Sequence, residues 1–217
     1  MKDTILLVFG YGGAQAMFDR HLPYFLRGEA DIMVVSPSDS PLAVPANVMG
    51  FTWGVSQHYG HSLMERHERA ISAAIGMGYE TICCIEADSI VLKEIPNPST
   101  GNGIDCFLFN NDPASGFKAK QYMHWPWLMS RDTAVCLATS LRWALKRGEI
   151  EQGFPDRMAA FAAEFVNIPL IHSPNLSYSQ NRLDTPQKMQ EARMAIANGA
   201  VCIHGLKTAQ ELEELTR

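Results

Sequence analysis

The sequence lacks long apolar runs. Five apolar residues, Ile5–Phe9, stop at a glycine, which is too few for the apolar region of a signal peptide. No other stretch approaches the roughly 20 apolar residues that a membrane-spanning helix needs. We therefore expect a soluble, intracellular protein of the cytoplasm, with no membrane span.

Cysteine and positive charge are also scarce. The five cysteines are odd in number and form no C-x-x-C pair, which favours buried free thiols in a reducing compartment. The net charge is −5 and the pI is about 5.8. This charge argues against a surface built mainly to hold nucleic acid, although it leaves room for a local basic groove.

The length and the hydrophobic pattern predict one α/β domain. At 217 residues, with 47% hydrophobic residues, the chain can bury a sizeable core. Short apolar runs predict strands at Ile5–Phe9, Ile32–Val35, Val48–Trp53, Ile82–Ile85, Asp105–Phe109, Leu128–Met129, Ile168–Ile171 and Ala200–Ile203. Helices are expected at Ala14–Arg27, Ser62–Met77, Arg131–Arg147, Glu151–Phe165 and Thr208–Arg217. The initial order of strand, helix and strand implies a parallel pair in a mostly parallel, Rossmann-like sheet.

The stretch Tyr79–Leu92 (YETICCIEADSIVL) organises the rest of the chain. Its apolar run stops at Glu86-Ala87-Asp88, where two carboxylates stand one residue apart. Acids at the edge of a buried sheet are costly unless a cation or hydrogen-bond donors compensate them. The triplet therefore indicates a site where a hard metal ion meets a phosphate-bearing substrate. It also fits a strand that simply ends with both acids solvated.

A glycine run, Gly10–Gly13, follows the first predicted strand directly. Its glycines permit close backbone approach to a ligand, and they serve equally well in a tight turn. The dinucleotide fingerprint G-x-G-x-x-G is incomplete, because Gln15 stands where the third glycine belongs. This run and the turn Ser36–Asp39 lie at carboxyl ends of predicted strands, where ligands bind in such folds.

The clearest helix, Ser62–Met77, carries a group of charged residues. Ser62 and Glu65 have the spacing of a capping box. Arg66 lies in the charged cluster 65–69, off the apolar stripe, and the ordinary interpretation of such a cluster is a solvated face.

The order of these features resembles the nucleotide-sugar-dependent glycosyltransferases of the GT-A fold, along nearly the whole chain. The features are the Ser36–Asp39 turn, the helix with Arg66, the acid-x-acid triplet and the late strand ending in His204-Gly205-Leu206-Lys207. The family's triplet is usually Asp-x-Asp, so Glu86 is a departure. The resemblance implies a single GT-A-like domain over 1–217, with 1–110 as the nucleotide-sugar-binding half and 111–217 as the acceptor-binding half.

The resemblance also implies roles for individual residues. Asp88 and His204 would ligate Mn²⁺ or Mg²⁺, while Glu86, beside the ion, would orient the ribose or a metal-bound water. Lys207 would neutralise the diphosphate leaving group. Contacts to the base, the ribose and the rest of the nucleotide are expected from Gly10, Tyr11, Gly12, Asp39 and Arg66.

The second half offers candidates for chemistry and for acceptor binding. Phe154-Pro155-Asp156 resembles the place where inverting members carry the catalytic base, so we expect Asp156 to deprotonate the acceptor hydroxyl. Asp156 also fits a plain helix-capping role. Trp125 and Trp127 are candidates for an acceptor platform, although buried indoles would be core.

The expected function is transfer of a sugar from a nucleoside-diphosphate sugar, with a UDP-sugar as the expected donor, to an acceptor hydroxyl. The acceptor could be a glycan, a small molecule or a modified nucleobase. One alternative is a nucleotidyltransferase, which would want a basic glycine-rich signature that 10–15 lacks. Another is a nucleotide-binding module without catalysis.

Overall fold

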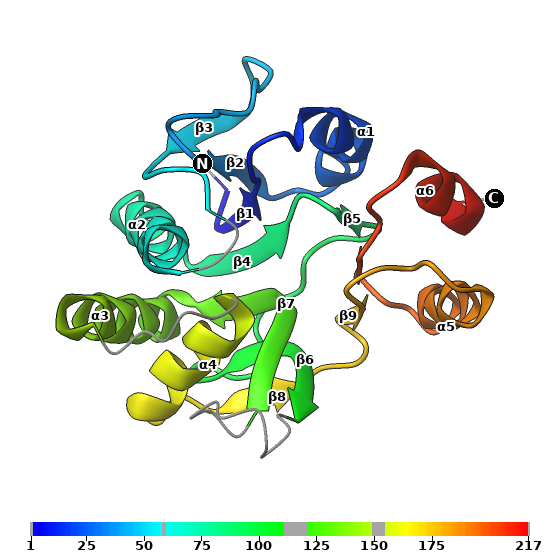
Figure 1. The fold of residues 1–217 in the computed structure, drawn as a ribbon. Coiled ribbons are helices and arrows are strands. Elements are labelled where there is room, and N and C mark those ends of the chain that lie inside the picture. The colour runs from blue at the N-terminus through cyan, green and yellow to red at the C-terminus, as the bar shows by residue number, and fades with distance from the viewer. Residues whose placement is uncertain (1, 58–59, 111–120, 149–154, 217) are drawn as a thin grey trace.

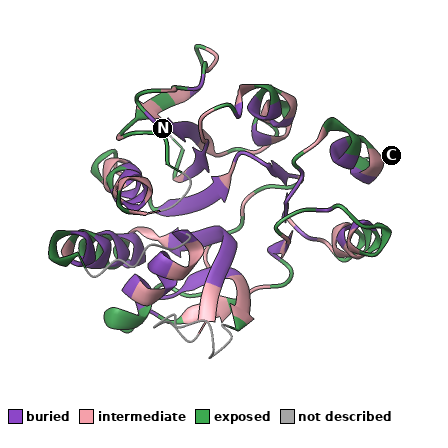
Figure 2. Ribbon diagram, viewed as in Figure 1, coloured by how far each residue is buried: buried purple, intermediate pink, exposed green. Residues whose placement is uncertain are grey.

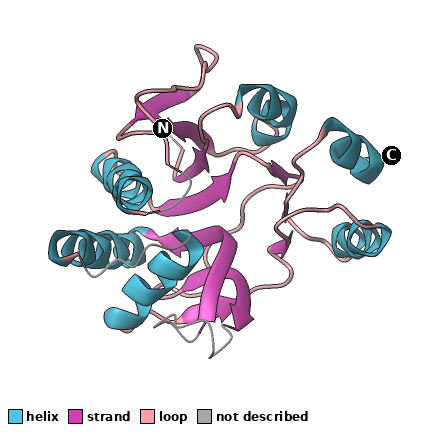
Figure 3. Ribbon diagram, viewed as in Figure 1, coloured by secondary structure: helices cyan, strands magenta, loops and turns pink. Residues whose placement is uncertain are grey.

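The computed structural model describes residues 2–57, 60–110, 121–148 and 155–216. A seven-stranded central sheet is flanked by helices, and a three-stranded sheet stands beside it (Figures 1 and 3). This arrangement confirms the α/β class and the mostly parallel central sheet. Most of the loop expected at Asn110–Tyr122, and Glu151 in the fourth predicted helix, lie outside the described residues.

The central sheet has the order β3-β2-β1-β4-β7-β6-β8. Its strands are β1 (Thr4–Phe9), β2 (Asp31–Ser36), β3 (Met49–Thr52), β4 (Thr81–Glu86), β6 (Ile104–Asn110), β7 (Gln121–Ser130) and β8 (Leu170–His172). The first four strands in the chain are parallel, as are β6 and β8, whereas β7 runs antiparallel to both of its neighbours. Strands from both predicted halves of the chain therefore share one sheet.

Successive side chains of β1 enter two different cores, because a strand points alternate residues to opposite faces. Ile5 and Leu7 pack in the core formed with α2 (His61–Gly76), α3 (Arg131–Arg147) and α4 (Pro155–Phe165). Leu6 and Val8 pack in the core formed with α1 (Gln15–Phe25). Figure 2 shows the resulting buried strands between helices with exposed outer faces. This double burial explains why the strands are continuous apolar runs.

The smaller sheet has the order β5-β10-β9 and carries the end of the chain. Its strands are β5 (Ser89–Val91), β9 (Ser177–Ser179) and β10 (Cys202–His204). The helices α5 (Pro186–Ala197) and α6 (Ala209–Thr216) lie beside it (Figure 1) and share its apolar core. This sheet begins where β4 ends, so it brings the C-terminal segment to the edge of the central sheet.

The element most changed from the sequence prediction is β7, of which only Leu128–Met129 was predicted. It runs for ten residues through Pro126, although proline usually argues against a central strand. The pairing explains the tolerance. The ladder with β4 covers only 127–130, and the register with β6 is interrupted between Asp105 and Phe107, opposite the proline.

Two elements in the C-terminal region were not predicted. The short strand β9 lies inside 173–185, which the composition indicated as a polar loop. Helix α5 begins with Thr185, whose hydroxyl accepts a hydrogen bond from the Lys188 N–H, and with Pro186 at its first position. A threonine cap followed by proline is an ordinary start of a helix, so these two residues are a sequence signal for α5.

The capping box predicted at Ser62 is wrong. Helix α2 starts at His61 after Gly60, and no side chain caps it. The Ser62 hydroxyl instead accepts a hydrogen bond from the Val55 N–H at 3.1 Å.

All five cysteines are free, and four of them are buried, whereas Cys136 is exposed. Among the described residues, no helix is both long and apolar enough to span a membrane.

Candidate functional site

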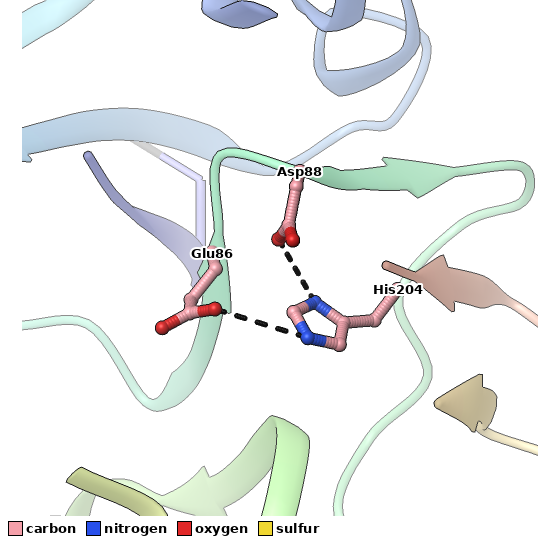
Figure 4. Close-up of side chains that lie close together, drawn as sticks. All are labelled: Glu86, Asp88 and His204. Carbon is pink, nitrogen blue, oxygen red and sulfur yellow. Dashed lines mark ion pairs between the residues drawn. The ribbon is translucent and has the colours of Figure 1, made fainter. Parts of the chain in front are cut away.

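Strand pairing brings the acid triplet and the late histidine together. The parallel register of β1 with β4 places Glu86 beside Phe9, at the end of both strands. The antiparallel register of β10 with β5 places His204 opposite Ser89, next to Asp88. Glu86, Asp88 and His204 therefore converge from two sheets, as Figure 4 shows.

Each ring nitrogen of His204 faces one carboxylate (Figure 4). Nδ1 lies 3.0 Å from Asp88 Oδ1, and Nε2 lies 3.8 Å from Glu86 Oε2. The Lys207 Nζ lies 3.5 Å from Asp88 Oδ2. Two carboxylates, an imidazole and an ammonium thus form one cluster, in which Asp88 is buried and the Glu86 side chain is 30% exposed.

Burial and the charged neighbours together set the pKa values of the cluster residues. Burial alone would raise the pKa of Asp88, but the adjacent His204 and Lys207 lower it to about 2. Burial alone would lower the pKa of His204, but Asp88 and Glu86 raise it. Burial and the neighbouring Asp88 raise the pKa of Glu86. His204 and Lys207 therefore offset the two carboxylates, and a bound metal ion would supply positive charge to the same oxygens.

The three ligand-type residues fit a divalent ion. One ligand atom from each of Glu86, Asp88 and His204 lies within 4.8 Å of the other two. Both Asp88 carboxylate oxygens are buried, and neither accepts a well-aligned hydrogen bond from a described residue, despite the close ion pairs. A buried carboxylate with unused lone pairs is costly unless a cation takes them. Carboxylate oxygens and imidazole nitrogens are common ligands of divalent metal ions in proteins.

The cluster opens onto a cleft of about 450 Å³. Glu86, His204 and Lys207 line the cleft, as do Tyr122, Asp156 and Arg157. Its apolar lining comes from Phe9, Leu63, Trp125 and Pro155. The cleft is large enough for a small organic substrate and combines an apolar wall with a few charged groups, as ligand sites usually do.

Asp156, which the sequence analysis predicts as the catalytic base, lines this cleft. It sits in the first turn of α4, where its Oδ1 accepts a hydrogen bond from the Arg157 N–H at 2.9 Å. Burial raises the pKa of Asp156 to about 6. A carboxylate with a pKa near the working pH is suited to general-base catalysis.

The residues predicted to contact the nucleotide fall into two groups. Gly10 and Tyr11 line the cleft beside the metal-type cluster. Gly12 and Asp39 do not line it. The Asp39 carboxylate accepts from the Ser56 N–H, at 2.8 Å to Oδ1 and 3.0 Å to Oδ2. A side chain at position 12 would meet the Ser56 hydroxyl, so this glycine allows close packing of the same loop.

Arg66 is completely buried, so the solvated face expected around it is wrong at this position. Its guanidinium donates hydrogen bonds to three backbone carbonyls, those of Trp53 (3.0 Å), Gly10 (3.4 Å) and Val55 (2.8 Å). Arg66 does not line the cleft. It holds the loop after β1 against the loop after β3, which is a supporting role for the site.

The tandem tryptophans belong largely to the core. Trp127 is completely buried, its N–H donates to the Met123 carbonyl at 3.0 Å, and it does not line the cleft. Trp125 stacks on it with ring centroids 3.9 Å apart. Trp125 is 3% exposed and lines the cleft, so only this indole is positioned to touch a ligand.

Several cleft residues were absent from the sequence prediction. His124, Asn181 and His67 line the cleft. The His67 Nδ1 lies 2.8 Å from the Leu63 carbonyl, and its ring stacks on Phe9 with centroids 3.8 Å apart. The only sequence signal for His124 was its place directly before Trp125, and no local pattern marked Asn181.

Comparison with known proteins finds no protein family and no curated protein that matches this sequence. The functional argument therefore depends on the geometry of the cleft.

Proposed function

We propose that this chain is a metal-dependent glycosyltransferase that moves a sugar from a nucleoside-diphosphate sugar, most simply a UDP-sugar, to an acceptor hydroxyl. The observation that carries the proposal is that Glu86, Asp88, His204 and Lys207 form one cluster, three members of which line the cleft. The GT-A-like fold remains part of this proposal. It is supported by the parallel strands β3-β2-β1-β4 and by carboxylates at the end of β4.

Glu86, Asp88 and His204 would hold the ion. When bound, a divalent ion supplies positive charge beside the leaving diphosphate. The Lys207 ammonium, 3.5 Å from Asp88 Oδ2, can add a second positive charge there. Breaking the sugar–phosphate bond builds negative charge on the diphosphate, so these charges stabilise the transition state more than the ground state.

Asp156 would act on the opposite reactant. In the proposed reaction, the acceptor oxygen bonds to the anomeric carbon, the bond from that carbon to the diphosphate breaks, and the acceptor proton passes to Asp156. With a pKa of about 6, Asp156 is mostly ionised at neutral pH and can accept this proton. The apolar wall with Trp125 would exclude water from the reacting groups.

A thermal-shift panel tests donor binding. UDP, GDP and their common hexose conjugates would be added with Mn²⁺, with Mg²⁺ and with EDTA. Binding at a hundred times the dissociation constant adds about 2.7 kcal/mol to the free energy of unfolding. We expect at least one sugar nucleotide to raise the melting temperature only when metal is present. No shift with any nucleotide would overturn the proposal.

The reaction products separate the alternatives. Release of a nucleoside diphosphate from the donor supports a glycosyltransferase. Formation of pyrophosphate from a nucleoside triphosphate would instead indicate a nucleotidyltransferase. Binding with no turnover of any donor, in the presence of an acceptor panel, would indicate a nucleotide-binding module.

A further inference from the structure

A second group of polar side chains, two of which line the cleft, takes no part in the proposed metal site. His124 on β7 contacts the Ser179 Oγ through Nδ1, and its Nε2 lies 3.2 Å from Asn181 Oδ1. Ser179 and His124 are buried, whereas Asn181 is exposed. These three residues form a hydrogen-bonded chain from the core to the cleft.

The partners of His124 fix its hydrogens. Asn181 Oδ1 can only accept, so the imidazole carries its proton on Nε2. Nδ1 is then an acceptor and takes the Ser179 hydroxyl proton. One neutral imidazole satisfies both neighbours. The carbonyl side of the Asn181 amide is therefore held toward His124, and its NH₂ group is directed away from His124.

The anchored amide lies next to the turn that carries Lys207. A side chain at Gly205 would meet the Gln180 carbonyl oxygen at 2.3 Å, and the Leu183 N–H donates to the Gly205 carbonyl at 3.0 Å. The segment around Asn181 thus packs directly on the His204–Lys207 turn, and Asn181, His204 and Lys207 line the same cleft. The His124 and His204 rings also meet edge to face, with centroids 4.8 Å apart.

The Asn181 NH₂ group has no acceptor among the described residues, so its two donors are available to a ligand. The ligand atom best suited to contact both an N–H donor and the Lys207 ammonium is an oxygen that carries negative charge and no proton. We propose that Asn181 donates a hydrogen bond to a phosphate oxygen of the substrate, and that His124 is the positioning residue that holds the amide for it. This inference rests on the proposed function, in which a diphosphate meets Lys207.

Asn181→Asp tests the binding role with almost no change in shape. The carboxylate can still accept the hydrogen bond from His124, but it presents an anionic oxygen where the NH₂ group stood. Titration calorimetry would measure the binding of inorganic pyrophosphate and of UDP, each with Mn²⁺. We expect both affinities to fall about 10- to 100-fold, because a hydrogen bond to a charged group is lost and a like charge is gained.

Asn97→Asp is the matched control. It adds the same charge at an exposed position that does not line the cleft. Its affinities should stay within about twofold of the parent, since an exposed charge outside the cleft is largely screened. Unchanged affinities in Asn181→Asp would overturn the inference, and so would an equal loss in Asn97→Asp.

A double-mutant cycle tests the positioning role of His124. If His124 acts through the amide, His124→Phe should weaken pyrophosphate binding in the parent but cause no further loss in Asn181→Ala. A simple structural disturbance would instead lower affinity equally in both backgrounds, which would contradict the positioning role.

Failure of this inference can be told apart from failure of the proposed function. Pyrophosphate binding that depends on Asn181, without binding of any nucleotide, would support the inference and contradict the proposed donor. Nucleotide binding that is unchanged by substitution of Asn181 would support the proposed donor and contradict the inference. No binding of pyrophosphate or nucleotide to the parent would overturn both.

Discussion

His204 Nδ1 lies 3.0 Å from Asp88 Oδ1, although His204 ends β10 and Asp88 stands in the distant turn between β4 and β5. Their contact follows from the antiparallel pairing of β10 with β5, in which His204 stands opposite Ser89. The same pairing brings Lys207 to within 3.5 Å of the Asp88 carboxylate. The proposed metal site is therefore formed by the attachment of the small sheet to the end of β4.

Asp88→Asn should abolish stabilisation by metal. The amide removes the negative charge that a divalent ion needs, while the side chain keeps its size. Mn²⁺ should raise the melting temperature of the parent and leave that of Asp88→Asn within about 1 °C, because the shift depends on binding to the folded state. Asp19→Asn removes an exposed carboxylate on α1 and should respond to Mn²⁺ like the parent. Equal shifts in Asp88→Asn and the parent would place the ion elsewhere.

Asp156→Asn should stabilise the protein above pH 6. The folded state raises the pKa of Asp156 from 3.8 to about 6, so folding favours its protonated form. Stability from this group is therefore lost as the pH rises from about 4 to 6, and the amide variant avoids the loss. The gain should be about 3 kcal/mol at pH 7.5 and close to zero at pH 3.5. Urea unfolding of both proteins at several pH values measures it, and a gain that is independent of pH would contradict the assigned pKa.

Gly205→Ala should strongly destabilise the fold. Gly205 has φ of +100°, and a Cβ there would lie 2.3 Å from the Gln180 carbonyl oxygen. Backbone strain and the steric overlap together should cost at least about 2 kcal/mol. Gly76→Ala, at the end of α2, is the control, because no atom lies within 4 Å of the added methyl group. It should be neutral or slightly stabilising, since alanine favours helix. A neutral Gly205→Ala variant would contradict the close packing of this turn.

Arg66→Lys should cost about 2–4 kcal/mol. One ammonium cannot replace the guanidinium that donates to the Trp53, Gly10 and Val55 carbonyls, so buried acceptors lose partners. Arg69→Lys, on the same helix and about half exposed, should change stability by less than about 0.5 kcal/mol. Similar losses in the two variants, measured by urea unfolding, would show that Arg66 is not a special support of the loops.

Much of the fold could be predicted because its strands are buried on both faces. Runs such as Ile5–Phe9 and Ile82–Ile85 are apolar throughout, and α3 begins and ends at the predicted residues. Strand β7 was largely missed because Pro126 usually breaks strands, and its tolerance depends on the register with β6, which no local pattern records. The three-residue strand β9 has too few residues to show a period.

The candidate site was predictable where its residues mark strand ends. Asp88 and His204 each stand at the boundary between an apolar run and polar sequence, so their chemistry was visible. Arg66 was misjudged because its charged neighbours resemble a solvated face, whereas its partners are backbone carbonyls from distant loops. Asn181 could not be predicted as a cleft residue, because its position depends on the contact with His124, which forms only in the folded protein.

The most direct test of the central claim measures the release of nucleoside diphosphate from a panel of UDP- and GDP-sugars. The reactions contain Mn²⁺ or EDTA, and chromatography quantifies the product. We expect the parent to release the diphosphate from at least one donor with Mn²⁺ and not with EDTA. Asp88→Asn, in a folded form confirmed by circular dichroism, should release it at least about 100-fold more slowly, because the charge stabilisation of the leaving group is lost. No release from any donor, or release that is unchanged by EDTA and by Asp88→Asn, would contradict the account.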